Sequence, residues 1–138
     1  LFFYPLYFTF VCPTEIEEFG NAYTEFQKLN CEVLACSTDS KHSHLAWRIH
    51  EHNLTTLPYP IMADFTKEIS RNYEILKEST GYALRGLYII DPEGILQYMV
   101  IHPEDVGRSS AETLRVLSAL QTGEKTPCNW SPGQKTLG

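Results

Sequence analysis

Short apolar runs alternate along the chain with segments in which apolar residues recur every three or four positions. The apolar runs, which predict strands, cover residues 1–4, 32–37, 61–63, 87–90 and 95–101. The last two runs flank the turn-forming residues Asp91 to Gly94 and therefore predict a hairpin. Strands that alternate with helical segments in this way are typical of an α/β layer architecture.

The helical segments lie between these strands. The first has its apolar residues at Ile16, Phe19, Tyr23, Phe26 and Leu29, which form one helix face. The second follows candidate N-caps at residues 38–40 and runs to about His52. A third is expected to begin after Asp64 or Thr66 and to end near Tyr73. Each of these helices has an apolar face that can cover a sheet.

A last helix and the segment after it divide the chain into two parts. Ser109 and Glu112 have the spacing of a capping box, which predicts a helix over about residues 110–121. Beyond it the chain is polar and interrupted by Gly and Pro. We therefore expect one packed domain over residues 1–121, whose first strands lie before Leu1, and a C-terminal tail over residues 122–138.

Composition and charge narrow the classes of function. Of the 138 residues, 43% are apolar and 20% are charged, as in ordinary globular domains. A net charge of −6 offers no basic surface for nucleic acid or for an anionic membrane. The apolar stretch over residues 1–11 contains Pro5 and is shorter than the roughly 18 residues that a membrane-spanning helix needs. We expect a cytoplasmic protein, although a chain that opens on Leu1 shows no targeting segment to judge by.

The four cysteines lack the paired spacing of zinc sites and of thioredoxin-type redox motifs. Cys12 precedes Pro13, a residue favoured in the first turn of a helix, so its thiol is expected at a helix N-terminus, where a thiolate is stabilised. Cys12 is therefore a candidate nucleophile, and the alternative is a buried, inert thiol. Cys31 and Cys36 flank an apolar strand or lie in it, and we expect both to be packing thiols.

Histidines crowd the second expected helix at positions His42, His44, His50 and His52. No carboxylate or cysteine follows any of them by three or four positions to complete a strong zinc motif. We therefore expect surface or packing histidines and no metal site. Trp47, on the same helix, is expected in the core.

The segment from Tyr4 to Glu15, YPLYFTFVCPTE, resembles the peroxidatic-cysteine signature of peroxiredoxins, whose core pattern is P-x-x-x-T-x-x-C. Further short motifs resemble those of peroxiredoxins in order and spacing: CEVLA at 31–35, STDS at 37–40, HLAW at 44–47, ALRGLYIID at 83–91, VGRS at 106–109 and NWSPG at 129–133. The chain is similar over essentially its whole length to typical 2-Cys peroxiredoxins of the alkyl hydroperoxide reductase C branch, without their usual first few dozen residues. This resemblance implies a thioredoxin-like fold, a central mixed sheet flanked by helices.

The resemblance also implies an activity, the reduction of hydrogen peroxide and organic hydroperoxides with electrons from a thioredoxin-like or other thiol reductant and without a metal or bound cofactor. Cys12 would attack the peroxide and become a sulfenic acid. Thr9 would hold the peroxide through its hydroxyl, and Arg85 would pair with the thiolate and the peroxide oxygens. Pro5 would limit the access of water to the thiol, and Glu15 would orient the arginine.

The second cysteine of the reaction departs from the family pattern. The resolving cysteine of that pattern lies four residues before the tryptophan, where this chain has Thr126, and Cys128 lies two residues later. We expect Cys128 to form a disulfide with Cys12 of another subunit. The alternative is a 1-Cys peroxidase, or resolution by an external thiol.

The family precedent implies a homodimer, commonly arranged in a ring of dimers. The G-G-L-G insertion of over-oxidation-sensitive members is missing from residues 51–59, and their Tyr-Phe helix is missing after Trp130, so we expect Cys12 to resist conversion to a sulfinic acid. The main alternative function is a non-catalytic oligomeric holdase or scaffold on the same fold. A general disulfide oxidoreductase is disfavoured because residues 12–15 lack the second cysteine of C-x-x-C.

Overall fold

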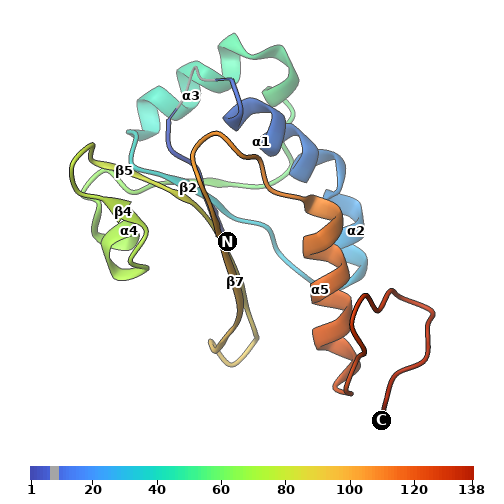
Figure 1. Cartoon of the computed structure of the whole chain (residues 1–138). Helices are drawn as coiled ribbons and strands as arrows, with labels where there is room; N and C mark the ends of the chain where they lie inside the picture. Colours follow the sequence, from blue (N-terminus) through green and yellow to red (C-terminus); the bar gives the residue numbers. More distant parts are fainter. Residues whose placement is uncertain (7–9) are drawn as a thin grey trace.

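The computed structural model describes residues 1–6 and 10–138. In this part of the chain a mixed sheet has the strand order β3-β2-β1-β6-β7 (Figure 1). Its strands are β1 (Phe2–Phe3), β2 (Ala35–Ser37), β3 (Ile61–Ala63), β6 (Arg85–Ile90) and β7 (Leu96–His102). The first three run parallel, β6 runs antiparallel to β1, and β7 closes the expected hairpin with β6. The α/β architecture expected from the alternating pattern is confirmed.

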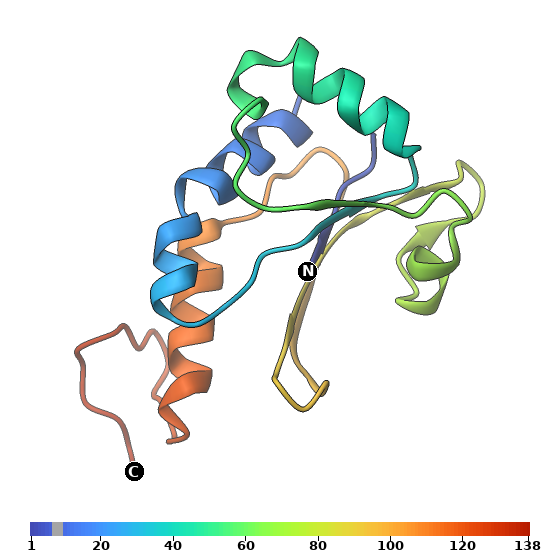
Figure 2. The ribbon, with the colours of Figure 1, turned by 180° about the vertical axis from the view of Figure 1, so that it is seen from behind.

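Helices cover both faces of this sheet. They are α1 (Cys12–Asn21), α2 (Tyr23–Lys28), α3 (Lys41–His50), α4 (Glu68–Asn72) and α5 (Ser110–Thr122), with a 3₁₀ turn η1 (His52–Leu54) after α3. Two views from opposite sides place α1, α2 and α5 together on one side of the sheet and α4 on the other (Figures 1 and 2). No helix in residues 1–6 and 10–138 is long and apolar enough to cross a membrane.

Two adjacent phenylalanines of β1 show how the sheet separates two cores. Successive side chains of a strand point to opposite faces. Phe2 packs in the larger core and stacks on Phe19 of α1, with ring centroids 4.7 Å apart. Phe3 packs in the smaller core with Tyr88 of β6, 5.8 Å away. Because both positions are fully buried, β1 is the central strand on which the layers are built.

The structure differs from the expected elements at three places. The single helix expected over the Ile16 to Leu29 face is interrupted at Ala22, next to the weak helix formers Gly20 and Asn21. A two-stranded sheet of β4 (Leu76–Lys77) and β5 (Tyr82–Ala83) was not expected, because two-residue strands carry no readable alternation. Helix α4 is short and begins after Lys67, whose φ of 65° lies in the left-handed region.

Candidate active site

Cys12 is the first residue of α1, and its side chain is fully buried. Pro13 occupies the first turn, where its missing N–H costs no hydrogen bond. The hydroxyl of Thr14 and the amide of Glu15 both donate to the carbonyl of Val11, at 2.7 and 3.3 Å, and fix the start of the helix. The thiol therefore lies at a helix N-terminus, as the Cys-Pro pair predicts.

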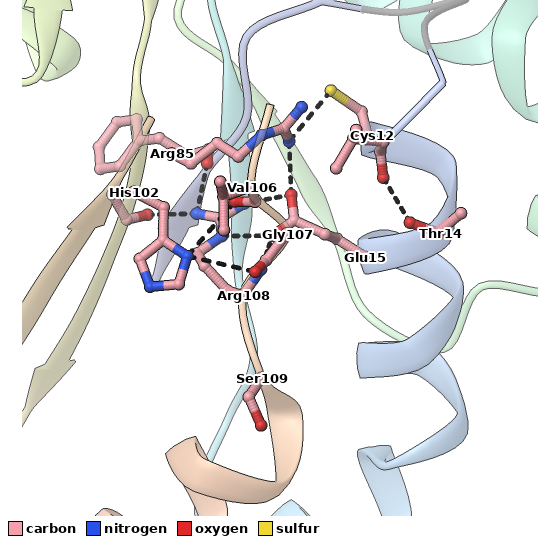
Figure 3. A network of polar contacts seen from close by, with 12 residues as sticks. Cys12, Thr14, Glu15, Arg85, His102, Val106, Gly107, Arg108 and Ser109 are labelled. Atoms are coloured by element: carbon pink, nitrogen blue, oxygen red, sulfur yellow. Dashed lines mark hydrogen bonds and ion pairs between the residues drawn. The ribbon is translucent and has the colours of Figure 1, made fainter. Parts of the chain in front are cut away.

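Arg85 reaches this thiol from the first residue of β6 (Figure 3). Its Nη1 lies 3.4 Å from Cys12 Sγ and 2.5 Å from a carboxylate oxygen of Glu15. Its Nε donates to the main-chain carbonyl of Glu104 at 2.6 Å, so the guanidinium is held on two sides. Because this cation is 3% exposed, its charge faces the sulfur with little screening by water.

Glu15 lies between two buried arginines (Figure 3). Arg108 donates to its carboxylate from Nε at 2.7 Å, from Nη2 at 3.0 Å and from its backbone amide at 2.7 Å. Burial alone would raise the pKa of Glu15, but the hydrogen bonds and charge of Arg108, together with the charge of Arg85, outweigh burial and lower it. The carboxylate is therefore ionised near neutral pH.

Arg108 was missed as a site residue, although it lies in the VGRS word of the sequence. Its Nη1 donates to the carbonyls of Phe3 and Gly86, both at 2.6 Å, and so it ties the cluster to β1 and β6. One signal could have indicated such a residue. Glu15 lies three positions after Cys12 and four before Phe19, on the buried face of α1. A carboxylate on a buried helix face requires a buried cation or hydrogen-bond donor.

A small cavity of about 210 Å³ opens onto the Cys12 thiol. Buried Pro5 and Arg85 line it together with Cys12, and the fully exposed Phe10 also borders it. Thr9, the expected peroxide-holding residue, lies outside the described residues. A larger apolar cavity of about 650 Å³ between α2, α5 and β6 contains none of the residues of this cluster.

The other cysteines occupy different settings, and all four thiols are free. Cys36 is fully buried in β2, and burial raises the pKa of its thiol to about 12, with a further contribution from Asp64. Cys31 is half-buried, and its thiol pKa is also raised by burial. Both thiols match the expected packing role. Cys128 is exposed in the tail, which folds back beside the C-terminal part of α5, away from the start of α1 (Figures 1 and 2).

One histidine of the histidine-rich helix α3 is buried. His44 is buried with Nε2 at 3.0 Å from the hydroxyl of Ser37, and burial lowers its pKa to about 4. Trp47 is buried against the ring of Tyr4, with centroids 6.0 Å apart. Across residues 1–6 and 10–138, no three His, Cys, Asp or Glu side chains are grouped as metal ligands.

A family model, a known relative and two solved structures are similar to this chain in sequence or fold. A family model described as AhpC/TSA family matches residues 1–99. A thioredoxin peroxidase of Trypanosoma brucei rhodesiense is 51% identical over 144 residues, covering 99% of this chain and 72% of the relative. The reduced 2-Cys peroxiredoxin of Plasmodium vivax superposes with a TM-score of 0.91 at 38% identity, over 97% of this chain and 72% of that one. The AhpC of Mycobacterium bovis superposes with a TM-score of 0.85 at 40% identity, over 94% of this chain and 72% of that one.

Proposed function

The chain belongs to the AhpC/TSA family of peroxiredoxins, and from this membership we propose a role for each residue around Cys12. The protein is a thiol-dependent peroxidase with a thioredoxin-like fold. Peroxide is its substrate, and a thiol such as that of thioredoxin is its reductant. The comparisons do not favour the scaffold alternative.

The observation that carries the proposed mechanism is the 3.4 Å contact between Arg85 Nη1 and Cys12 Sγ. The Cys12 thiolate attacks one peroxide oxygen, the O–O bond breaks, and the other oxygen leaves as an alkoxide or hydroxide that takes a proton from water. Sulfur is oxidised to a sulfenic acid and the peroxide is reduced to an alcohol or water. Arg85 stabilises first the thiolate and then the charge that grows on the departing oxygen.

Glu15 is the positioning residue for that arginine. Two guanidinium groups and one carboxylate leave one positive charge in the cluster, which a Cys12 thiolate neutralises. The carboxylate also fixes the direction of the Arg85 fork, because Arg108 holds it from the other side.

Pro5 and Thr9 complete the proposed pocket. Pro5 is buried beside Cys12 and has no N–H, so it presents an apolar wall where another residue would present a donor. For Thr9 the support is the matching position in the family signature, P-x-x-x-T-x-x-C. Its hydroxyl can both accept and donate, as a peroxide held next to a thiolate requires.

Cys128 is proposed as the resolving residue of the tail, residues 122–138. Its thiol condenses with the Cys12 sulfenic acid of another subunit, which forms a disulfide and releases water. The exposure of Cys128 and the position of the tail away from the start of α1 support an intersubunit reaction. Cys12 is fully buried, so the first turn of α1 has to unwind before the two Cα atoms come within roughly 7 Å.

We further propose a homodimer formed through β7, and a ring of such dimers, in the cytoplasm. β7 is the edge strand of the sheet, and its outward residues Met99 and Ile101 are exposed. A long edge with apolar outward positions is a surface that proteins normally cover. On α3, exposed Leu45 and Ile49 form a second apolar surface for contacts between dimers. Four free thiols suit a reducing compartment.

The roles of the cysteines are tested by adding one equivalent of peroxide to the reduced protein and running a non-reducing gel. We expect a disulfide-linked dimer whose linked peptides contain Cys12 and Cys128. Cys128→Ser abolishes that dimer, and the matched controls Cys31→Ser and Cys36→Ser retain it. A dimer that persists in Cys128→Ser, together with continued turnover, would exclude Cys128 and support the 1-Cys alternative.

A further inference from the structure

The tail that carries Cys128 is a closed loop, and most of its polar contacts are internal. The amide of Leu137 donates to the carbonyl of Lys125 at 2.7 Å, which brings the two ends of the loop together. The indole of Trp130 donates to the carbonyl of Gln134 at 3.1 Å. Trp130 is 4% exposed, whereas every other residue from 123 to 138 is exposed or half-buried. The tail is therefore anchored near Trp130, two residues from the proposed resolving thiol.

Arg115 of α5 makes the polar part of this anchor. Its Nη1 donates to the main-chain carbonyl of Trp130 at 2.8 Å. In the described part of the chain this is the one hydrogen bond between residues 125–138 and α5. Glu112, one turn earlier, accepts from Nε at 2.7 Å and from Nη2 at 2.8 Å, so it aims the remaining nitrogen at the tail.

Arg115 also lies within electrostatic reach of the Cys128 thiol. Hydrogen bonding to Glu112 raises the pKa of Arg115, and the Cys128 thiol acts in the same direction. The guanidinium thus contacts the tail at Trp130, two residues after Cys128. In the described part of the chain, the hydrogen bonds and ion pair of Arg115 go to Glu112 and Trp130 and to no residue of the Cys12 cluster, so a change at Arg115 leaves the polar contacts of that cluster in place.

We propose that Arg115 is a positioning residue for the resolving step, a clasp that holds the Cys128 tail on its own α5 and limits how often the thiol departs toward Cys12 of another subunit. This inference rests on the proposed role of Cys128. The sulfenic acid has two fates: it condenses with Cys128 and releases water, or a second peroxide oxidises it to the sulfinic acid. The clasp therefore determines what fraction of the sulfenic acid forms the disulfide and what fraction is oxidised to the sulfinic acid.

The expected size of the change in the rate of disulfide formation follows from the single hydrogen bond to the tail that Arg115→Ala removes. The Arg115 side chain is partly exposed, so we give this bond the strength of an ordinary intramolecular hydrogen bond, and its removal raises the population of the released tail about threefold to tenfold. Disulfide formation in Arg115→Ala should accelerate by the same factor, and the fraction of Cys12 converted to sulfinic acid at a fixed peroxide concentration should fall. Arg115→Lys keeps the charge but cannot bond Glu112 and Trp130 in the same forked geometry, so it should show a smaller acceleration.

The experiment is stopped-flow tryptophan fluorescence on the reduced full chain. A fast phase proportional to peroxide concentration reports oxidation of Cys12, and a slower phase independent of it reports disulfide formation. Mass spectrometry gives the sulfinic fraction. The matched control is Arg71→Ala, because Arg71 forms the same kind of two-pronged surface pair, with Glu78 at 2.9 and 3.5 Å, on α4 on the opposite side of the sheet.

We expect the slow phase to accelerate in Arg115→Ala and to stay unchanged in Arg71→Ala, while the fast phase is the same in both. An unchanged or slower second phase in Arg115→Ala would overturn the clasp. Two further results separate this inference from its premise. A wild-type protein with no fast phase would refute the peroxidase site itself. A slow phase that survives in Cys128→Ser would refute Cys128 as the resolving residue, and the clasp with it.

Discussion

Four side chains from three separate stretches of the chain form one buried cluster, in which Arg85 contacts the Cys12 sulfur. Cys12 and Glu15 come from one turn of α1, Arg85 from the start of β6, and Arg108 from the loop before α5. Removing one partner from a buried ion pair leaves an uncompensated charge, which destabilises proteins strongly. The cluster therefore links stability and reactivity through the same carboxylate.

Replacing that carboxylate tests the link. In Glu15→Gln the two guanidinium groups lose their common acceptor, so Arg85 is no longer aimed at Cys12. We expect the second-order rate constant with hydrogen peroxide to fall about tenfold to a hundredfold, and the free energy of unfolding to fall by about 3 kcal/mol. Competition kinetics and urea titration measure the two effects.

The control for this change is Glu25→Gln, which removes an exposed carboxylate paired with Lys28 on α2. It should leave the rate constant unchanged and alter stability by less than about 0.5 kcal/mol. An unaltered rate constant in Glu15→Gln would show that Arg85 is oriented without the carboxylate.

At the scale of elements, the sequence predicted most of what a short-range pattern can encode. The cap at Ser109, which accepts from the amide of Glu112 at 3.1 Å, and the strand Ile61–Ala63 were predicted correctly. The break at Ala22 was not, because a turn that preserves the apolar face leaves the three-four spacing intact. Tertiary packing decides that position, since Phe19 and Phe26 stack across the break, 6.0 Å apart.

In the candidate site, too, some residues could be predicted from the sequence and others could not. Cys12 was predicted from its Cys-Pro pair and from the surrounding signature, whereas Arg85 and Glu15 depended on the resemblance. Arg108 could not be singled out from local pattern, because its partners lie 22 to 105 positions away in the chain. A long-range buried ion pair leaves no periodic signal, and only the buried carboxylate of Glu15 indicates that a partner must exist.

Helix α3 is joined to β2 by a contact that depends on pH. Burial lowers the pKa of His44 to about 4 from an ordinary value of 6.5. Between these two pH values the ring is therefore neutral in the folded state and protonated in the unfolded state. The contribution to stability is complete above about pH 6.5 and is lost as the pH falls toward 4, by roughly 3 kcal/mol.

His44→Gln tests this, because a glutamine amide can replace the contact with Ser37 but cannot ionise. Urea unfolding between about pH 7 and pH 4 should show a smaller loss of stability in the variant than in the wild type. His42→Gln, an exposed histidine on the same helix, should follow the wild type. Identical pH dependence in all three proteins would mean that His44 does not titrate differently on folding.

For the whole molecule, the proposed assembly depends on an edge strand. Met99 and Ile101 point outward from β7 and are 52% and 42% exposed. A lysine at Met99 introduces a charge into a covered apolar edge, so Met99→Lys should shift the protein from dimer to monomer in sedimentation velocity. Leu137→Lys, which changes an exposed tail residue, should remain dimeric. A wild-type monomer in both redox states would rule out the assembly.

The central claim is that Cys12 is the peroxide-reducing thiol, and peroxide consumption with a thioredoxin system tests it most directly. The wild type should consume hydrogen peroxide catalytically, and Cys12→Ser should lose about a thousandfold or more of that rate, because a serine hydroxyl is a far weaker nucleophile at neutral pH. Cys36→Ser, which changes a buried thiol outside the cluster, should retain it. Undiminished consumption by Cys12→Ser, or none by the wild type, would contradict the account.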